Sequence, residues 1–161
     1  MVAHKFLEVL DQKSSLLGAL RGWEALIDKG AALLAEELSR GATLALLAPE
    51  GWEGLAHFVA DLLRRRLSLA GEAVTCDPEV AEGAVALLLC PQRPDDAFLS
   101  RVTALGEKGH AMLVFCGAER GLVGGLGHWC AEVPLTDPSA TAQAIAWLVD
   151  ALAADALCCE Q

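Results

Sequence analysis

The chain opens with two stretches whose apolar residues recur at helical spacing. In the first, residues 3–20, the apolar positions are Phe6, Val9, Leu10, Leu16, Leu17 and Leu20. In the second, about 22–39, one stripe is formed by Trp23, Ile27, Ala31, Leu34 and Leu38. The second stretch stops before Gly41, and glycine commonly ends a helix. We therefore expect a pair of N-terminal helices within residues 1–40, packed on the sheet of the domain or on a partner subunit.

After Gly41, short apolar runs alternate with segments of helical period. Continuous apolar runs are typical of strands buried on both faces, and they fall at 42–48, 72–76, 84–89, 111–115 and 129–133. Helices are expected at about 52–69, 95–108 and 138–157, with a short one at 119–125. This alternation predicts an α/β fold, a three-layer αβα sandwich of the flavodoxin-like type with a five-stranded parallel sheet. Ligands of such sheets bind at the carboxyl ends of the strands, where the strand order reverses.

Length and composition favour one folded domain over residues 1–161. The chain has 161 residues and a mass of 16.9 kDa, which is the size of a single ordinary domain. Hydrophobic residues make up 54% and charged residues 21%, so a core can form and intrinsic disorder is not expected.

The charge balance excludes two classes of partner. Twelve Lys and Arg stand against 22 Asp and Glu, which gives a formal net charge of −10. A nucleic acid or an anionic membrane attracts a positive surface, so we expect neither as a partner. The apolar runs at 42–49 and 83–91 are also far shorter than the roughly 20 residues of a membrane-spanning helix.

The cysteines and the first residues together predict a reduced, cytoplasmic protein. Charged residues interrupt the N-terminal stretch, which has no apolar signal-peptide core. Without an export signal, the six cysteines are expected to be reduced thiols. None forms a C-x-x-C pair, so neither a zinc ribbon nor a thioredoxin-type redox motif is expected. Cys76, Cys90 and Cys116 fall at the carboxyl ends of expected strands. They fit either small buried residues or a reactive thiol set for redox or metal sensing.

Three loops are expected at the ligand-binding edge of the sheet: 49–51, 91–95 and 117–127. A phosphate-binding loop needs glycine and hydroxyl residues close to a helix N-terminus. The first loop instead brings Glu50 and Glu53, and the second brings Asp95 and Asp96. These carboxylates stabilise a helix start by about 0.3–1 kcal/mol each, and they would repel a phosphate.

Two segments resemble the sugar isomerase (SIS) domain, and within it the phosphoheptose isomerases and the related replication-initiator-associating proteins. GWEGLAHFVADL, residues 51–62, is similar to the first loop and helix of that subgroup, including its His-Phe pair. GGLGHWCAEVP, residues 124–134, is similar to the turn into the last strand, which ends in Val-Pro. The similarity runs in the same order over nearly the full chain.

The resemblance implies a ligand site on the first two loops and the last helix. The residues that it places there are Glu50, Gly51, Trp52, Cys90, Gln92, Arg93, Asp95 and Gln143. Two hydroxyl-rich positions depart from the family pattern: Gly51 replaces a serine, and Cys90-Pro91-Gln92-Arg93 replaces a Ser-x-Ser-Gly clamp. Arg93 could hold an anion through its guanidinium, or it is a solvated loop residue.

The resemblance also implies zinc as a candidate cofactor. His57 and Asp61, one helical turn apart, match the first ligand pair and are the candidate catalytic residues; Gln143 matches a third ligand. The fourth ligand position holds Ala151 in place of histidine. Leu55, Phe58, Val59, Leu62 and Leu63 share one stripe of this helix, so His57 and Asp61 are expected on the opposite side. That side would carry an exposed ion pair in a monomer, or would face a neighbouring subunit in an oligomer.

Three functions follow from the resemblance and its departures. The first is an SIS-type protein that binds a phosphosugar or another carbohydrate derivative, with weakened or lost isomerase activity. The second is an active aldose–ketose phosphate isomerase, which needs a base close to the substrate carbon. The third is a non-enzymatic oligomeric adaptor that binds another protein, because the N-terminal stripes exceed what a five-stranded sheet needs to cover. For the chain in general we expect a homo-oligomer, a dimer or a tetramer.

Overall fold

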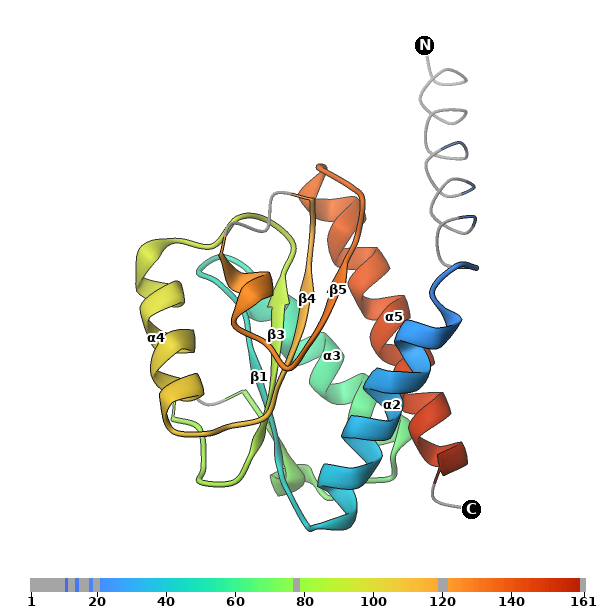
Figure 1. Ribbon diagram of the computed structural model, residues 1–161, viewed down its shortest axis with the longest axis vertical. Coiled ribbons are helices and arrows are strands. Elements are labelled where there is room, and N and C mark those ends of the chain that lie inside the picture. The colour runs from blue at the N-terminus through green and yellow to red at the C-terminus, as the bar shows by residue number, and fades with distance from the viewer. Residues whose placement is uncertain are drawn as a thin grey trace.

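The computed structural model describes residues 21–76, 79–118 and 122–159, together with Asp11, Ser14 and Gly18. Its centre is a parallel five-stranded sheet with the strand order β2-β1-β3-β4-β5 (Figure 1). The strands are β1 (Leu44–Leu47), β2 (Val74–Thr75), β3 (Val85–Cys90), β4 (Met112–Cys116) and β5 (Trp129–Glu132). The predicted sheet is confirmed, and each strand begins within three residues of its predicted start.

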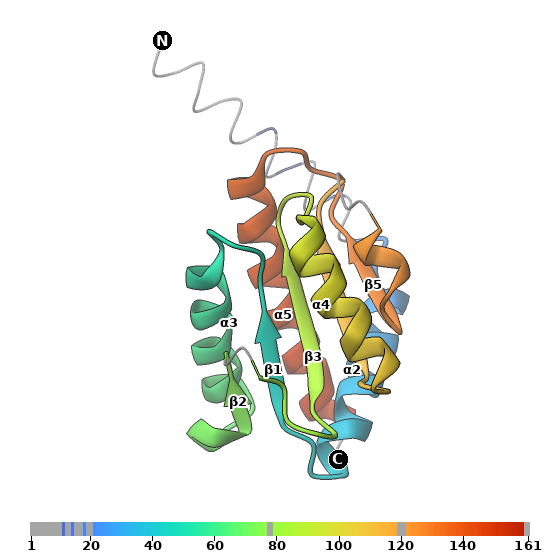
Figure 2. The same ribbon diagram turned by 90° about the vertical axis from the view of Figure 1, so that its left-hand side faces the viewer.

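Helices cover both faces of this sheet. The α-helices are α2 (Glu24–Ser39), α3 (Glu53–Arg66), α4 (Asp96–Glu107) and α5 (Pro138–Cys159), and short 3₁₀ helices occupy Gly71–Ala73 (η1) and Val123–Gly125 (η2). Figures 1 and 2 show α2, α3 and α5 on one face and α4 on the other. The predicted three layers are therefore confirmed. The expected helix at 3–20 lies almost wholly outside the described residues, as do three residues of the one expected at 119–125.

Strand β3 shows why the three central strands, β1, β3 and β4, are apolar at every position. Val85, Leu87 and Leu89 pack in the core under α2, α3 and α5. The alternate residues Ala86, Leu88 and Cys90 pack in the second core under α4 and η2. Because successive side chains of a strand point to opposite faces, a sheet covered on both faces needs an apolar residue at each position.

Helix α2 packs closely on α5 and on the edge strand β5. The indole Nε1 of Trp129 donates a hydrogen bond to the carbonyl oxygen of Leu26, at 2.8 Å. A Cβ atom at Gly30 would lie 2.7 Å from Leu152 Cδ1 and 2.7 Å from Trp129 Cε2. Gly30 thus allows a helix approach that a larger residue would block, and α2 covers the outer strand of the sheet.

Helix α5 is apolar around most of its circumference. By length and composition alone, Pro138–Cys158 is sufficient to cross a membrane, which the sequence reasoning on 42–49 and 83–91 did not consider. In the structure α5 lies between α2 and α3 against the sheet (Figure 1), and half of its most apolar stretch is buried. Such a helix is typical of a protein core, but its outer face is open in the single chain.

The buried face of α3 differs from the predicted stripe. The buried residues are Ala56, Val59, Ala60 and Leu63, whereas the Phe58 side chain is 53% exposed. The small side chains of Ala56 and Ala60 let α3 approach the sheet, and this turns Phe58 towards α5. The predicted inclusion of Phe58 in the core stripe is therefore wrong, while His57 and Asp61 are exposed as expected.

Gly30 and Gly54 form a matched pair that tests the close packing of α2. We expect Gly30→Ala to lower the free energy of unfolding by about 1–3 kcal/mol, because the added methyl group overpacks against Trp129 and Leu152. No atom lies within 4 Å of the corresponding position at Gly54, so Gly54→Ala should raise it by about 0.4–1 kcal/mol. Urea denaturation measures both; equal stability of Gly30→Ala and the wild type would contradict the close approach.

Candidate functional site

A crevice of about 430 Å³ opens at the carboxyl edge of the sheet, between α3 and α4. It lies beyond the end of β1, where the chain passes to β2 on one side and β3 lies on the other. The order of strands reverses at this point, which is where parallel α/β sheets bind ligands. We call this cavity the switch-point crevice. Its polar lining residues are Glu50, Glu53, His57, Asp95 and Arg101.

The loop after β1 forms the first wall of the crevice. Gly51 has a φ of +85°, a left-handed conformation that glycine adopts without strain. The amide of Trp52 donates to the carbonyl oxygen of Pro49 at 3.0 Å, and the amide of Gly51 donates to Glu53 Oε1 at 3.2 Å. Backbone and carboxylate contacts thus hold this loop in place, and its sequence offers no hydroxyl group to a phosphate.

The start of α4 forms the opposite wall. Asp95 is the N-cap residue, and its Oδ1 accepts a hydrogen bond from the amide of Phe98 at 2.8 Å. The capping role expected of Asp95 is therefore confirmed. The same residue also lines the crevice, so its carboxyl group is held in a fixed position beside the cavity.

The electrostatic character of the crevice is acidic. Three carboxylates, from Glu50, Glu53 and Asp95, face the cavity together with one guanidinium, from Arg101, and the His57 imidazole. Like charges repel strongly where water is partly displaced, so a phosphate dianion meets an unfavourable field. Hydroxyl and amino groups can instead donate hydrogen bonds to the carboxylates.

The structure separates the ligand residues that the resemblance implies. Glu50, His57 and Asp95 line the switch-point crevice. Trp52 and Gly51 belong to the turn that leads into α3, and neither lines the cavity.

Three of the residues expected to bind a ligand at the second loop, Cys90, Gln92 and Arg93, do not line the crevice. Cys90 is fully buried at the end of β3, in the core under α4. Gln92 and Arg93 are exposed in the following loop and lie outside the crevice lining. Arg93 thus fits the alternative of a solvated loop arginine.

The residues proposed as zinc ligands lie in three different settings. His57 lines the crevice, whereas Gln143 lines a separate groove between α3 and α5. Asp61 Oδ1 accepts a hydrogen bond from Arg64 Nη1 at 2.8 Å, so the exposed ion pair of this helix is Asp61–Arg64. Among the described residues, no group of three or more His, Cys, Asp or Glu residues could hold a metal ion. These side chains therefore do not fit a zinc site within one chain.

Arg101 is the crevice residue that the sequence reasoning did not single out. It lies in the second turn of α4, three residues after Phe98 and four after Ala97, and all three line the cavity. Residues at this spacing share one face of a helix. A helical-wheel projection of α4 that starts at its N-cap, Asp95, would have placed Arg101 on the same face as Ala97 and Phe98.

A cluster of thiols lies on neighbouring strands: Cys90 and Cys116 end β3 and β4, and Cys130 is the second residue of β5. Cys116 Sγ is 3.7 Å from Cys130 Sγ and 3.8 Å from the carbonyl oxygen of Ala131. Burial raises the pKa of Cys90 to about 12, and the hydrogen bond with Cys130, together with burial, raises the pKa of Cys116. Because the thiolate is the reactive form, both thiols fit buried structural residues better than redox or metal sensors.

The comparisons with known proteins bear on the fold. No model of a protein family matches the chain, and no curated protein matches it either. Solved structures do match. Their fold is the SIS-type α/β fold that the sequence motifs predict, so this expectation is confirmed.

Three of these structures are informative. The phosphoheptose isomerase of Francisella tularensis has a TM-score of 0.70 at 13% identity, over 96% of this chain and 95% of its own. The phosphoheptose isomerase of Neisseria gonorrhoeae gives 0.74 at 15% identity, over 94% of each chain. A protein from Salmonella typhimurium LT2 assigned as sugar-binding gives 0.72 at 18% identity, over 96% of this chain and 49% of its own. At such identities the likeness establishes the fold.

The raised pKa values of Cys90 and Cys116 predict that these thiols react slowly with thiol reagents. In the native protein at mildly alkaline pH, we expect Cys90 and Cys116 to resist a disulfide reagent such as DTNB, while the exposed Cys158 reacts. In denaturant all three should react alike, since unfolding removes burial and the thiol–thiol contact. Mass spectrometry of the labelled peptides reports each site. Modification of Cys116 as fast as Cys158 would restore thiol sensing as a function.

Proposed function

We propose that the protein binds a carbohydrate derivative in the switch-point crevice and has lost aldose–ketose isomerase activity. The fold shared with two phosphoheptose isomerases and a protein assigned as sugar-binding supports the ligand class. The observation that carries the proposal is the crevice itself, at the point of strand reversal with its polar side chains already in place.

The lining of the crevice suits a hydroxyl-rich molecule. Its volume of about 430 Å³ lies in the ordinary range for small-molecule sites, ~300–1,000 Å³. Carboxylates at Glu50 and Asp95 can accept hydrogen bonds from sugar hydroxyl or amino groups. Ala56 and Phe98 line the same cavity and offer apolar contact to the C–H face of a ring.

A phosphate group is the less favoured part of such a ligand. The two loops at this edge lack the hydroxyl residues of a phosphate clamp, and Arg101 is the guanidinium that lines the crevice. Three carboxylates line the same cavity, so binding of a phosphosugar would have to overcome their repulsion. We therefore rank neutral or amine-bearing sugar derivatives above phosphorylated ones.

Isomerase activity needs a base that is held close to the substrate carbon and protected from water. His57 is exposed at the crevice, and Asp61 bonds to Arg64 on the outer surface of α3. Both candidate catalytic residues are therefore open to solvent in the single chain, and Asp61 is engaged by Arg64. This exposure supports a binding protein without turnover.

Ligand binding is measured as thermal stabilisation with a panel of hexoses, heptoses, their amino derivatives and their phosphates. A true ligand at a hundredfold excess over Kd stabilises by about 2.7 kcal/mol. We expect Glu50→Gln to weaken binding about tenfold, which is about 1.4 kcal/mol, because it removes a charged acceptor. Glu72→Gln, on η1 away from the crevice, is the matched control and should bind as the wild type does. Absence of any shift across the panel would refute sugar binding.

Turnover is tested separately with a heptose phosphate, with and without added zinc. We expect no product above the background rate, since His57 and Asp61 are both exposed to water and Asp61 is paired with Arg64. Product formation that disappears in both His57→Ala and Asp61→Ala would establish the active isomerase instead. Chromatographic detection of the ketose and aldose forms is sufficient.

The adaptor alternative rests on a different requirement, an exposed apolar surface. Such a surface lies between α3 and α5, where Phe58 and Trp147 are both exposed. It is separate from the crevice, so sugar binding and protein association do not compete for the same residues.

A further inference from the structure

We propose, building on the sugar-binding function above, that the switch-point crevice selects a sugar with a protonated primary amine, whose ammonium group interacts with the carboxylates of Glu50, Glu53 and Asp95. Two of these residues lie on opposite walls of the crevice. Glu53 belongs to the first turn of α3, and Asp95 is the N-cap of α4. A neutral sugar would occupy the same cavity without using these charges, so the amine is what distinguishes the selected ligand.

Negative charge exceeds positive charge in the crevice. Three carboxylates and one guanidinium line it, which leaves an excess of two negative charges when His57 is neutral. Helices α3 and α4 both begin here, and each helix start contributes about half a positive charge, which reduces this excess without cancelling it. The formal net charge of −10 on the whole chain also attracts cations. A cationic ligand is therefore favoured.

The backbone holds two of the carboxylates in position. Glu53 Oε1 accepts a hydrogen bond from the amide of Gly51 at 3.2 Å, and Asp95 Oδ1 accepts one from the amide of Phe98 at 2.8 Å. A carboxylate has two oxygens and several acceptor sites, so a ligand can donate to it while the internal hydrogen bond persists. Because these side chains are ordered before the ligand arrives, binding costs less conformational entropy.

The spacing of the acidic groups favours a molecular cation over a metal ion. Among the residues that the structure describes, no group of three or more His, Cys, Asp and Glu residues could hold a metal ion. A divalent metal ion needs its oxygen ligands at roughly 2.0–2.6 Å. An ammonium group instead donates up to three hydrogen bonds over about 2.7–3.2 Å, and the rest of the molecule fills the remaining space.

Buried apolar residues line the same cavity and give a sugar ring a surface to contact. Leu46 and Leu47 belong to β1, Ala56 to α3 and Phe98 to α4. A pyranose has apolar C–H faces and a polar rim, so its ring can contact these residues while its amine reaches the carboxylates. A small amine without a ring would leave this surface uncovered.

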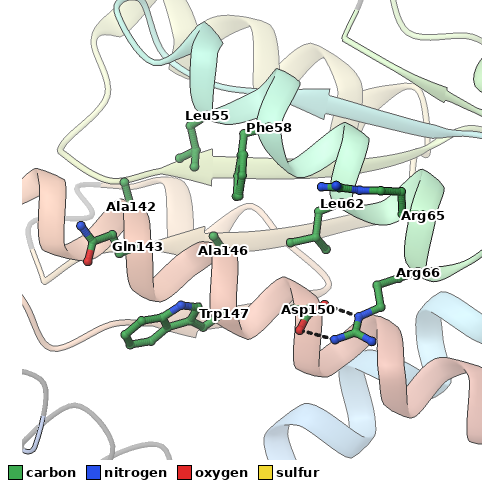
Figure 3. Close-up of a pocket in the computed structure, with 10 residues that line it drawn as sticks. All are labelled: Leu55, Phe58, Leu62, Arg65, Arg66, Ala142, Gln143, Ala146, Trp147 and Asp150. Carbon is green, nitrogen blue, oxygen red and sulfur yellow. Dashed lines mark hydrogen bonds and ion pairs between the residues drawn. The ribbon is translucent and has the colours of Figure 1, made fainter.

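The wall that carries Glu53 is anchored along its length. Ala56 and Ala60 of α3 pack in the core against the sheet. At the far end of the helix, Arg66 Nη2 donates to Asp150 Oδ2 at 2.8 Å and joins α3 to α5 (Figure 3). The crevice is therefore formed before a ligand binds.

Calorimetric titration of the full chain with matched pairs of sugars tests the role of the amine. The pairs are glucosamine with glucose, galactosamine with galactose and mannosamine with mannose, which differ only in an amino or a hydroxyl group. We expect the amino sugar of at least one pair to bind roughly tenfold more tightly than its neutral partner, because it alone is cationic. If only neutral or phosphorylated sugars bind, the selection of an amine is refuted and sugar binding stands. If no sugar binds, both are refuted.

Substitutions that remove charge alone test the assigned residues. Glu53→Gln and Asp95→Asn keep an oxygen acceptor for the amides of Gly51 and Phe98. We expect each to weaken binding of the amino sugar roughly tenfold, and that of the matching neutral sugar less than about threefold. Equal losses for the two sugars would overturn the assignment, because a merely structural role affects both alike.

Arg101 and Glu107 provide a substitution of opposite sign and a control. Arg101→Gln removes the positive charge that competes with the amine, and it should strengthen binding of the amino sugar roughly threefold. Weaker binding would contradict the charge argument. Glu107 is the last residue of α4, is exposed and lies outside the crevice lining. Glu107→Gln should bind the amino sugar as the wild type does.

Alkylation of Cys76 locates the bound ligand. This thiol is partly exposed and lines the crevice, whereas the exposed Cys158 lies near the end of α5. We expect a saturating amino sugar to slow the reaction of Cys76 with iodoacetamide at least about threefold, because a ligand in the crevice covers it. Cys158 should react at an unchanged rate. Mass spectrometry of the peptides measures both, and unprotected Cys76 in the presence of bound amino sugar would overturn the proposed site.

Discussion

The need to cover both faces of a buried parallel sheet determines where this protein can bind a ligand. Side chains of β3 alternate between two cores, so one set of helices must lie on each face. The connection after β1 therefore places α3 on one face, and the connection after β3 places α4 on the other (Figure 2). The space between the carboxyl ends of β1 and β3 is therefore covered by neither α3 nor α4. The switch-point crevice follows from this arrangement and does not depend on which residues fill its walls.

The walls then decide what the crevice can hold. Gly51 forms a tight turn with a positive φ, and Asp95 caps α4, so both loops are stabilised by contacts within the chain. A phosphate-binding loop would leave its amides and hydroxyls free for the anion. Here the carboxylates that stabilise the loops also face the cavity. The same residues thus support the fold and give the crevice its acidic lining.

The sequence predicted the fold more completely than the site, and the reason is physical. Apolar runs and helical periods follow from burial, and they located the strands and the helices from α2 onwards. The helical spacing of apolar residues in α3 did not predict which of them would be buried. Ala56 and Ala60 pack on the sheet, whereas Phe58 turns towards α5. Arg101 joined the crevice only through the packing of α4. Such contacts between elements distant in sequence leave no local pattern.

Helix α3 connects the two surfaces because consecutive residues point to different sides. Ala56 and His57 line the switch-point crevice, whereas Leu55 and Phe58 line the groove between α3 and α5. The Arg66–Asp150 pair anchors the far end of this helix to α5. Helix α3 is therefore one wall of the crevice and one wall of the groove. Because α3 packs on the sheet through Ala56 and Ala60, its position sets the width of both cavities together.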